Sequence, residues 1–270
     1  MAGSRTLGPT RRSFLTDRPY LRDAGELALV ALAFLLYFVV RANVVDNPDR
    51  AFANAGDLLR IERDLGIDWE ADVQGAVLGS RPLVKLSNLV YFWLDFPLIA
   101  AVGLLLYGLR RRQYTFARDA ILFSGGLALI FYALLPVAPP RLLPEAGVID
   151  TLQRYSNLSY QAQSTQFFVN PYAAVPSLHV GWAFLLSAGV IWAFWPNKLV
   201  LAAAVLHPLA QTAATVLTGN HYLLDAVAGF AVAAAGLAFA VLMQRWGYAV
   251  LGRALGVDSL APLGDLRVSS

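Results

Sequence analysis

The sequence predicts an all-α membrane protein, a polytopic bundle of six transmembrane helices with interfacial amphipathic helices between the first two. Three observations support this fold class: the composition, the number of long apolar stretches and the distribution of basic residues. Of the 270 residues, 57% are hydrophobic and 14% are charged, and the mean hydropathy is +0.55. Soluble domains average about 45–50% apolar and about 25% charged residues. A lipid bilayer is therefore the expected solvent.

Six stretches are long enough to cross a bilayer, which takes roughly 20 mostly apolar residues. Each can satisfy its backbone hydrogen bonds internally, as hydrocarbon requires. Because the joints at Pro196-Asn197 and Gly219-Asn220 are short, the last three spans are expected to pack as a tight antiparallel set. No clear small-x-small cleavage site follows the basic leader, so we expect a retained anchor rather than a signal peptide. The six stretches are 24–41, 84–108, 117–137, 178–195, 198–218 and 222–243.

The basic residues indicate how the bundle is inserted. If the six spans alternate, 13 of the 21 Lys and Arg residues lie on one side, in the leader, the Arg-rich link after the second span, Lys198 and the tail. The other side holds seven basic and ten acidic residues. By the positive-inside rule both termini are cytoplasmic and the 42–82 and 138–177 loops lie outside. We expect a multi-pass plasma-membrane protein whose active site faces the extracytoplasmic side.

The domain organisation follows from the same spans. We expect a cytoplasmic leader over 1–23, one membrane domain over 24–245 with its core motifs in 138–225, and a cytoplasmic tail over 246–270. In the 42–82 loop, apolar residues alternate with charged ones, which indicates short amphipathic helices in the interface or, equally, a soluble packing hairpin. Four prolines and the polar stretch 161–166 indicate that the 138–177 loop is an irregular or partly re-entrant cap.

The composition also excludes several kinds of site. The chain has no cysteine, so disulfides, Cys-ligated zinc, iron–sulfur clusters and thiol nucleophiles are excluded. Three histidines are few for a multi-His metal site, although a site made of histidine and carboxylates is not excluded by their number. The arginines form no long run of the kind that binds nucleic acid. We therefore expect catalysis without a metal or another cofactor, and no nucleic-acid partner.

Polar residues cluster at three places that the six-span topology brings to the outer end of the bundle. Arg141 follows the third span, the segment 176–179 opens the fourth, and the segment 219–225 opens the sixth. Ionisable groups at membrane depth are costly and indicate function. His221 and Asp225 are spaced i, i+4, so Asp225 can accept the imidazole Nδ1–H and leave Nε2 as a nucleophile. The alternative is that both residues only cap and pin the helix start.

The start of the fourth span has the features of an anion site. Pro176-Ser177 is a helix start signal, and the following amides, with Leu178 first, can bind an anion. His179 in the first turn can protonate a leaving oxygen and then act as a base, or it can be a satisfied interfacial histidine. Arg141 offers five donors suited to phosphate oxygens, although a lone loop arginine more often meets lipid head groups.

Three further ionisable residues lie inside predicted spans. His207 precedes Pro208 and is interpreted as a packed residue at a kink. Lys85 supplies a second phosphate contact or, as we favour, extends its ammonium group to the interface. Asp95 lies deeper and has no assigned role. Together, Asp95 and His207 leave open a transport pathway near the midplane.

These motifs resemble those of the type 2 phosphatidic acid phosphatase superfamily, six-span lipid phosphatases and phosphotransferases with the motifs Lys-x6-Arg-Pro, Pro-Ser-Gly-His and Ser-Arg-x5-His-x3-Asp. The segment 176–179 matches the second motif except at Leu178, His221 and Asp225 match the core of the third, and Arg141 matches the arginine of the first. Leu134 and Leu142 stand where the first motif has its lysine and its proline, and Ala214 and Thr215 stand where the third motif has Ser-Arg.

At the positions where the sequence departs from these motifs, it resembles the branch of the superfamily that includes inositol phosphorylceramide synthase and, more distantly, sphingomyelin synthase. The segments Val175–His179 and Thr218–Asp225 have the forms familiar there, and the resemblance covers roughly residues 80–245. It implies that His221 attacks a lipid phosphate or phosphodiester, that Asp225 orients it and that His179 protonates the leaving alkoxide. Arg141, Ser177 and the first-turn amides then hold the equatorial oxygens.

The acceptor of the second step is left open by these motifs. The partners implied are a membrane lipid substrate and, for a transferase, a polyol or lipid alcohol acceptor. Head-group transfer like that of inositol phosphorylceramide synthase is favoured, and hydrolysis of a lipid or polyprenyl phosphate is the alternative. A non-catalytic lipid-phosphate binder or transporter is the alternative of another class.

Overall fold

The computed structural model describes residues 19–43, 47–156 and 170–255. This part of the chain is helical, without a strand. The long apolar helices indicate a multi-pass membrane protein. The helices are α1 (Pro19–Asn43), α2 (Pro48–Leu65), α3 (Glu70–Leu78), α4 (Arg81–Trp93), α5 (Phe96–Leu109), α6 (Arg111–Leu134), η1 (Pro140–Leu142), η2 (Pro144–Ala146), α7 (Thr151–Tyr155), α8 (Leu178–Phe194), α9 (Lys198–Leu217), α10 (Leu223–Leu242), η4 (Met243–Gly247) and α11 (Tyr248–Leu255).

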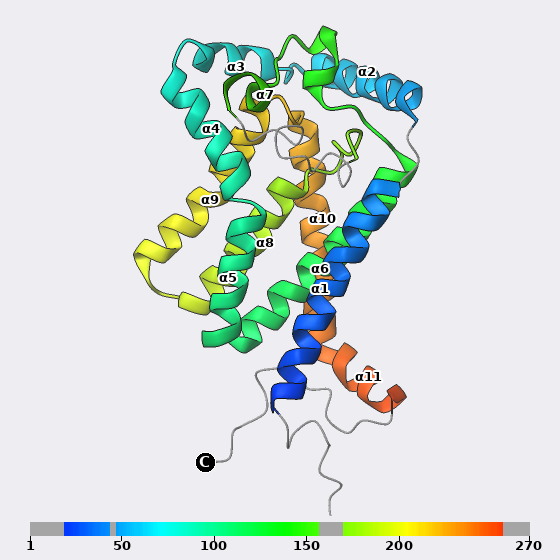
Figure 1. Ribbon diagram of the computed structural model, residues 1–270, viewed down its shortest axis with the longest axis vertical. Coiled ribbons are helices and arrows are strands. Elements are labelled where there is room, and N and C mark those ends of the chain that lie inside the picture. The colour runs from blue at the N-terminus through cyan, green and yellow to red at the C-terminus, as the bar shows by residue number, and fades with distance from the viewer. Residues whose placement is uncertain (1–18, 44–46, 157–169, 256–270) are drawn as a thin grey trace, which may run out of the picture.

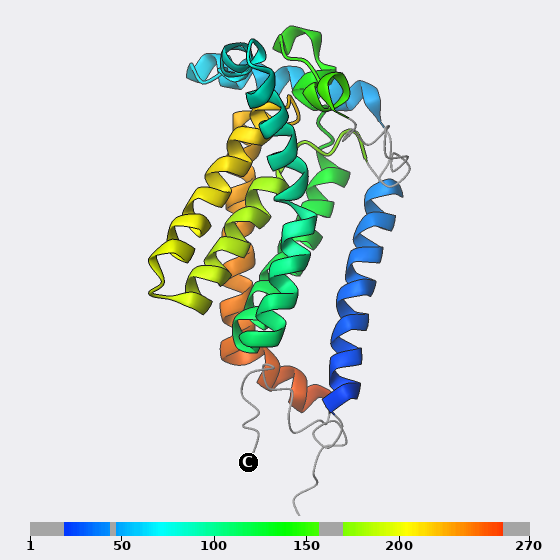
Figure 2. The same ribbon diagram turned by 60° about the vertical axis from the view of Figure 1, so that its left-hand side comes forward.

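The long helices form a bundle in which α8 is central. It packs against α6, α9 and α10, and α6 in turn packs along α10. Helix α1 lies at the edge of the bundle, where its main neighbour is α6 (Figures 1 and 2). The main apolar core consists of side chains from α6, α8 and α10, with Tyr37 of α1 among its buried members.

The helices qualify as membrane spans to different degrees. In the described ranges, α1, α6, α9 and the continuous run from α10 to Ala254 are long and apolar enough to cross a bilayer. A fifth span results if α4 and α5, which are bent by 48° relative to each other, are taken together. Helix α8 is apolar but has only 17 residues. The count of six spans therefore stays a prediction.

The structure changes the boundaries of several predicted spans. The uninterrupted second span over 84–108 is wrong, because the helix breaks between Trp93 and Phe96. Pro97 explains the break, since a proline has no N–H to donate to the carbonyl four residues earlier, at Trp93, and its ring clashes with that carbonyl; it is tolerated in the first turn of α5. Helix α1 begins inside the predicted leader, and α6 begins at Arg111 instead of residue 117. Helix α10 continues through η4 into α11, so the predicted tail begins with helix.

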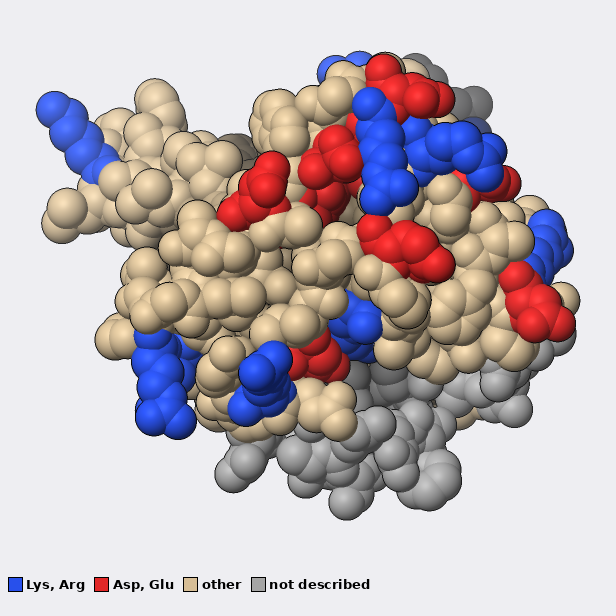
Figure 3. Space-filling view, turned by 90° about the horizontal axis from the view of Figure 1, so that it is seen from above, with Lys and Arg blue, Asp and Glu red and all other residues tan. Residues whose placement is uncertain are grey.

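The 42–82 loop forms two helices, α2 and α3, which lie with α7 across one end of the bundle (Figure 1). That they are amphipathic helices in the membrane interface stays a prediction. Asn47 caps α2 by accepting a hydrogen bond from the Arg50 amide at 3.1 Å, and Gly66 ends it with a φ of 68°. The Arg50 and Asn54 side chains donate to carbonyls at the end of α6. Seen from this end, acidic and basic side chains are interspersed (Figure 3). The segment 161–166 of the predicted cap lies outside the described residues.

Two glycines let α8 and α10 approach each other at the level of their N-termini. A Cβ atom on Gly229 would lie 2.3 Å from the carbonyl oxygen of Ser177, and one on Gly181 would lie 2.8 Å from the carbonyl oxygen of Gly229. Any larger residue at either position therefore forces the two helices apart. The close crossing places the start of α8 directly beside the start of α10.

We expect Gly229→Ala to destabilise the protein by about 1–3 kcal/mol, the usual cost of overpacking, and to reduce activity by displacing α8 from α10. Thermal unfolding in detergent and turnover of a lipid phosphate measure the two effects. Gly103→Ala in α5 is the matched control, because a Cβ atom there meets no atom within 4 Å. Equal melting temperatures for the two variants would contradict the packing argument.

The opposite end of the bundle is held by a buried polar network. Arg118 of α6 pairs with Glu26 of α1 at 2.5 Å and with Asp119 at 2.7 Å. Tyr248 of α11 donates to Asp119 at 2.6 Å. These contacts fasten α1 and α11 to α6 at this end.

Candidate active site

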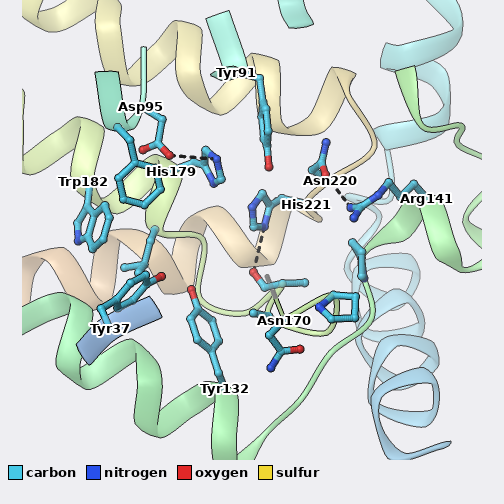
Figure 4. A pocket seen from close by; sticks show the side chains of 16 residues that line it. Tyr37, Tyr91, Asp95, Tyr132, Arg141, Asn170, His179, Trp182, Asn220 and His221 are labelled. Atoms are coloured by element: carbon cyan, nitrogen blue, oxygen red, sulfur yellow. Dashed lines mark hydrogen bonds and ion pairs between the residues drawn. The ribbon is translucent and has the colours of Figure 1, made fainter. Parts of the chain in front are cut away.

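A small pocket lies beneath the layer of α2, α3 and α7, where the N-termini of α8 and α10 meet. Its volume is about 40 Å³. Side chains of α1, α4, α6 and α8 line it, together with residues of the segments before α8 and α10. Figure 4 shows that His179 and His221 both line this pocket, with Arg141 reaching toward Asn220. The predicted polar clusters are thus brought together.

His221 lies directly before α10 and is held by two oxygen acceptors. Its Nδ1 is 3.1 Å from Asp225 Oδ2 and 3.0 Å from the carbonyl oxygen of Ala174. Because both partners only accept hydrogen bonds, Nδ1 carries the proton and the lone pair is on Nε2. Asp225 is fully buried and also accepts the Tyr222 amide at 2.9 Å. The predicted dyad is present, and it caps the helix as well.

His179 forms a second pair with a carboxylate. Its Nε2 is 3.3 Å from Asp95 Oδ2, and its ring stacks on Tyr91 at 4.3 Å between centroids. Asp95 occupies the break between α4 and α5. His207 braces this break, with Nε2 2.9 Å from the Leu94 carbonyl oxygen and Nδ1 3.2 Å from Ser187 Oγ. Asp95 thus has a role at the site that sequence reasoning left unassigned, and His207 is a packed, hydrogen-bonded residue.

The two histidines are near neighbours, with 5.5 Å between their ring centroids. The crossing of α8 and α10 at Gly181 and Gly229 explains this distance, together with a hydrogen bond of 3.0 Å from the Ser177 amide to the Asp225 carbonyl oxygen. Two imidazoles, each with a carboxylate partner, therefore line one small pocket.

Arg141 lies at the rim of the same pocket. Its Nη1 donates to Asn220 Oδ1 at 2.6 Å, and its Nε lies 3.1 Å from Asp150 Oδ2. Its amide donates to the carbonyl oxygen of Gly219, which ends α9 with a φ of 73°. Asp150 and Asn220 hold the guanidinium in place, a role that neither residue's local sequence signalled.

The start of α8 has the predicted helix geometry. Ser177 is the N-cap residue and Leu178 begins the helix, so first-turn amides point toward the pocket end of α8. Leu178 lines the pocket. The Ser177 side chain is fully buried, and its Oγ has no hydrogen-bond partner among the residues described. Ser177 does not line the pocket, so the structure does not bring its hydroxyl to the place predicted for a phosphate contact.

The structure does not bring Lys85 into the site. Its side chain is exposed on α4 and is absent from the pocket wall. The part of the chain that the structure describes also holds no group of three or more His, Asp or Glu side chains that could bind a metal ion.

Two buried carboxylates that the sequence did not single out support the start of α10, the helix that follows His221. Glu62 of α2 accepts the Leu224 amide at 2.8 Å, and Glu70 of α3 accepts the Leu223 amide at 2.8 Å. Both side chains are buried. Each carboxyl oxygen thereby satisfies a first-turn amide that has no partner within the helix. Helices α2 and α3 therefore position the start of α10. In the sequence, only the amphipathic pattern around Glu62 indicated that this segment packs against another part of the protein.

Burial raises the pKa of Glu62 to about 8, and the charges of Glu70 and Asp225 act in the same direction, whereas the Leu224 hydrogen bond opposes the shift. Between the ordinary value of 4.5 and about 8, the folded protein then binds this proton more tightly than the unfolded chain. The free energy of unfolding therefore falls as the pH rises through this window.

We expect Glu62→Gln to flatten that decline, since the neutral amide keeps an acceptor for the Leu224 amide and never ionises. The melting temperature of the purified protein measured across the window checks this. Asp64→Asn, at an exposed position of the same helix, is the control and should leave the slope unchanged. An unchanged slope in Glu62→Gln would show that another group titrates.

Comparison with known proteins agrees with this geometry. A family model described as PAP2 superfamily matches residues 56–239, a range that contains both histidines, their carboxylates and Arg141. No curated protein and no solved structure matches the chain significantly.

Proposed function

The chain belongs to the PAP2 superfamily, and on that premise we propose that it is an integral membrane lipid phosphotransferase that works through a phosphohistidine intermediate without a metal. Membership supports lipid phosphatase or phosphotransferase chemistry in general. The observation that carries the proposal is the pairing of two histidine–carboxylate dyads, with ring centroids 5.5 Å apart, in a pocket that Arg141 also lines.

In the first half-reaction, the Nε2 lone pair of His221 attacks phosphorus. The bond from phosphorus to the leaving oxygen breaks, and protonated His179 transfers its proton to that oxygen. Asp225 and the Ala174 carbonyl stabilise the positive charge that develops on His221. The guanidinium of Arg141 and the first-turn amides of α8 are placed to stabilise the phosphoryl oxygens.

In the second half-reaction, a hydroxyl group gives its proton to His179 while its oxygen attacks phosphorus, and the bond between phosphorus and His221 breaks. Asp95 stabilises the imidazolium of His179 at both stages. Water as the acceptor makes the enzyme a phosphatase, and a polyol or lipid hydroxyl makes it a transferase. We favour head-group transfer like that of inositol phosphorylceramide synthase because of the motif forms at 175–179 and 218–225.

Purified protein in detergent, incubated with a panel of lipid phosphates and phosphodiesters in the presence of a chelator, tests the proposal. Inositol, diacylglycerol or ceramide is added as acceptor in parallel reactions. Exchange of the head group supports transfer, whereas phosphate release alone supports hydrolysis of a lipid or polyprenyl phosphate. Inactivity across the panel favours a lipid-phosphate binder or transporter, and activity only without the chelator contradicts the metal-free mechanism.

We also propose that the protein lies in the plasma membrane with both termini in the cytoplasm and the pocket facing outward. Because the chain has no cysteine, single cysteines report the orientation. Glu145→Cys in the end layer is expected to react with an impermeant maleimide on intact cells. Lys198→Cys, at the start of α9, is the matched position at the other end of the bundle and should react only after permeabilisation. The reverse pattern would invert the topology.

A further inference from the structure

A second, larger cavity opens between α1 and α6, with a volume of about 210 Å³. Its lining is entirely apolar apart from the Tyr37 hydroxyl and the Trp182 indole N–H, and it includes Phe34 of α1 and Gly126 of α6. We call this cavity the α1–α6 groove. Helix α1 is a candidate membrane span with little of its surface buried, so the groove lies among side chains that face hydrocarbon.

The α1–α6 groove adjoins the pocket of the two histidines. Tyr37 and Trp182 line both cavities. Trp182 follows His179 by three residues on α8, so the two side chains lie on the same face of that helix. The Trp182 indole is held by a hydrogen bond of 3.1 Å to Ser124 Oγ. The apolar cavity and the polar pocket are therefore separated by little more than these two aromatic rings.

The groove exists because α6 carries two adjacent glycines where α1 passes. A Cβ atom on Gly125 would lie 3.1 Å from the Trp182 ring, whereas one on Gly126 would meet no atom within 4 Å. The ion pair of Glu26 with Arg118 holds α1 against α6 near its other end. Gly125 thus lets the Trp182 ring approach α6, and the missing side chain of Gly126 leaves a space that the neighbouring helices do not fill.

We propose that the α1–α6 groove holds a hydrocarbon chain of the lipid whose phosphate reacts at His221. This inference rests on the proposed function. A groove of this lining in a bilayer takes an apolar occupant, because an unpaired polar group there is costly. Because the groove shares Tyr37 and Trp182 with the histidine pocket, the substrate's own chain is favoured over bulk lipid: a lipid whose phosphate is held beside the histidines has its chain next to the groove. The phosphate would lie beside His179 and His221, and the chain would pass Tyr37 and Trp182 into the groove.

Gly126→Phe tests the proposal, because the new ring has room and fills the groove. Gly103→Phe in α5 is the matched control, since Gly103 also meets no atom within 4 Å and does not line the groove. For a long-chain lipid phosphate, kcat/KM in Gly126→Phe is expected to fall by about tenfold or more, the loss for two or more methylenes kept out of an apolar site. For a short-chain soluble analogue with the same head group it should change by less than about twofold, the scatter usual for substitutions away from a site.

The outcomes separate the two levels of the proposal. Equal losses with both substrates, or no loss with either, would overturn the groove as the chain site while leaving the phosphotransferase standing. Gly126→Leu, a smaller obstruction, should give an intermediate loss that is still confined to the long-chain substrate. Absence of turnover with every substrate in the native protein would overturn the proposed function itself.

A binding measurement keeps the groove testable without turnover. A lipid phosphate with a photoreactive group in its chain is expected to label α1 or α6 in the native protein and in Gly103→Phe, and not in Gly126→Phe. Excess unlabelled long-chain lipid phosphate should suppress the labelling, whereas a fatty-acid methyl ester of the same chain length, which has neither a phosphate nor a hydroxyl group, should not. Equal suppression by both lipids would show that the groove holds bulk lipid and would overturn the proposal.

Discussion

His221→Ala is expected to abolish turnover of every phosphate ester, with alkyl or aryl leaving groups alike, because the proposed mechanism assigns the attack on phosphorus to His221 Nε2, whereas the other imidazole, His179, is paired with Asp95 and acts as acid and base. Phosphate release and acid-labile labelling of the protein by a radioactive substrate measure the loss. His207→Gln is the matched control, since His207 is a histidine outside the pocket and glutamine keeps polar groups for its partners. Near-normal activity in His221→Ala would refute the nucleophile assignment.

Asp225→Asn should leave more activity than His221→Ala. When a triad loses its orienting aspartate, the wrong imidazole tautomer lowers kcat roughly 10⁴-fold. Here the Ala174 carbonyl also accepts from Nδ1 at 3.0 Å, so the productive tautomer is partly retained and the expected loss is smaller. A loss as complete as that of His221→Ala, in a protein with unchanged thermal stability, would show that Ala174 does not support the tautomer.

His179→Gln is expected to separate the two half-reactions. General acid catalysis contributes typically about 10²–10⁴-fold, and a good aryl leaving group does not need it. The variant should therefore lose most of its activity on alkyl phosphates, yet release close to one equivalent of aryl alcohol in a rapid burst from an aryl phosphate. The phosphohistidine then accumulates, because the base for the second step is missing.

Asp95→Asn should show the same pattern with smaller losses, because it leaves His179 in place and removes only its counter-charge. Rapid-quench measurement of the burst and of the trapped phosphoenzyme checks both variants. Asp225→Asn serves as the contrast, since it slows formation of the phosphoenzyme and should give no burst. If His179→Gln also gives no burst, His179 acts in binding or in the first step for all leaving groups.

Part of the site was predictable because it depends on local spacing. His221 and Asp225 lie four residues apart, although His221 precedes α10 instead of sharing a helix face with Asp225: the carboxylate in the first turn reaches back to the imidazole. The start of the fourth span at Ser177 and the apolar lengths of most spans follow from equally local rules. The break in the second span was missed, because the average hydropathy of a long apolar run does not register a single proline that interrupts the helix.

The partners of the site residues depend on helix packing instead. Asp95 pairs with His179, and Glu62 and Glu70 cap α10, although each comes from another helix far away in sequence. Lys85 has the positive charge expected of a second phosphate contact, but its side chain lies on an exposed face of α4. No periodicity encodes such pairings, since they follow from the angles and separations of packed helices.

The sequence alone therefore specified the membrane class, the family motifs and the pairing of His221 with Asp225, which are encoded in composition or within a few neighbouring residues. The second dyad, the carboxylate caps and the α1–α6 groove emerged from the fold. They require α8 and α10 to cross at Gly181 and Gly229, and α1 to pass Gly125 and Gly126. The effect of a glycine depends on which atoms of the neighbouring helix lie opposite it, and these are known only once the helices have packed.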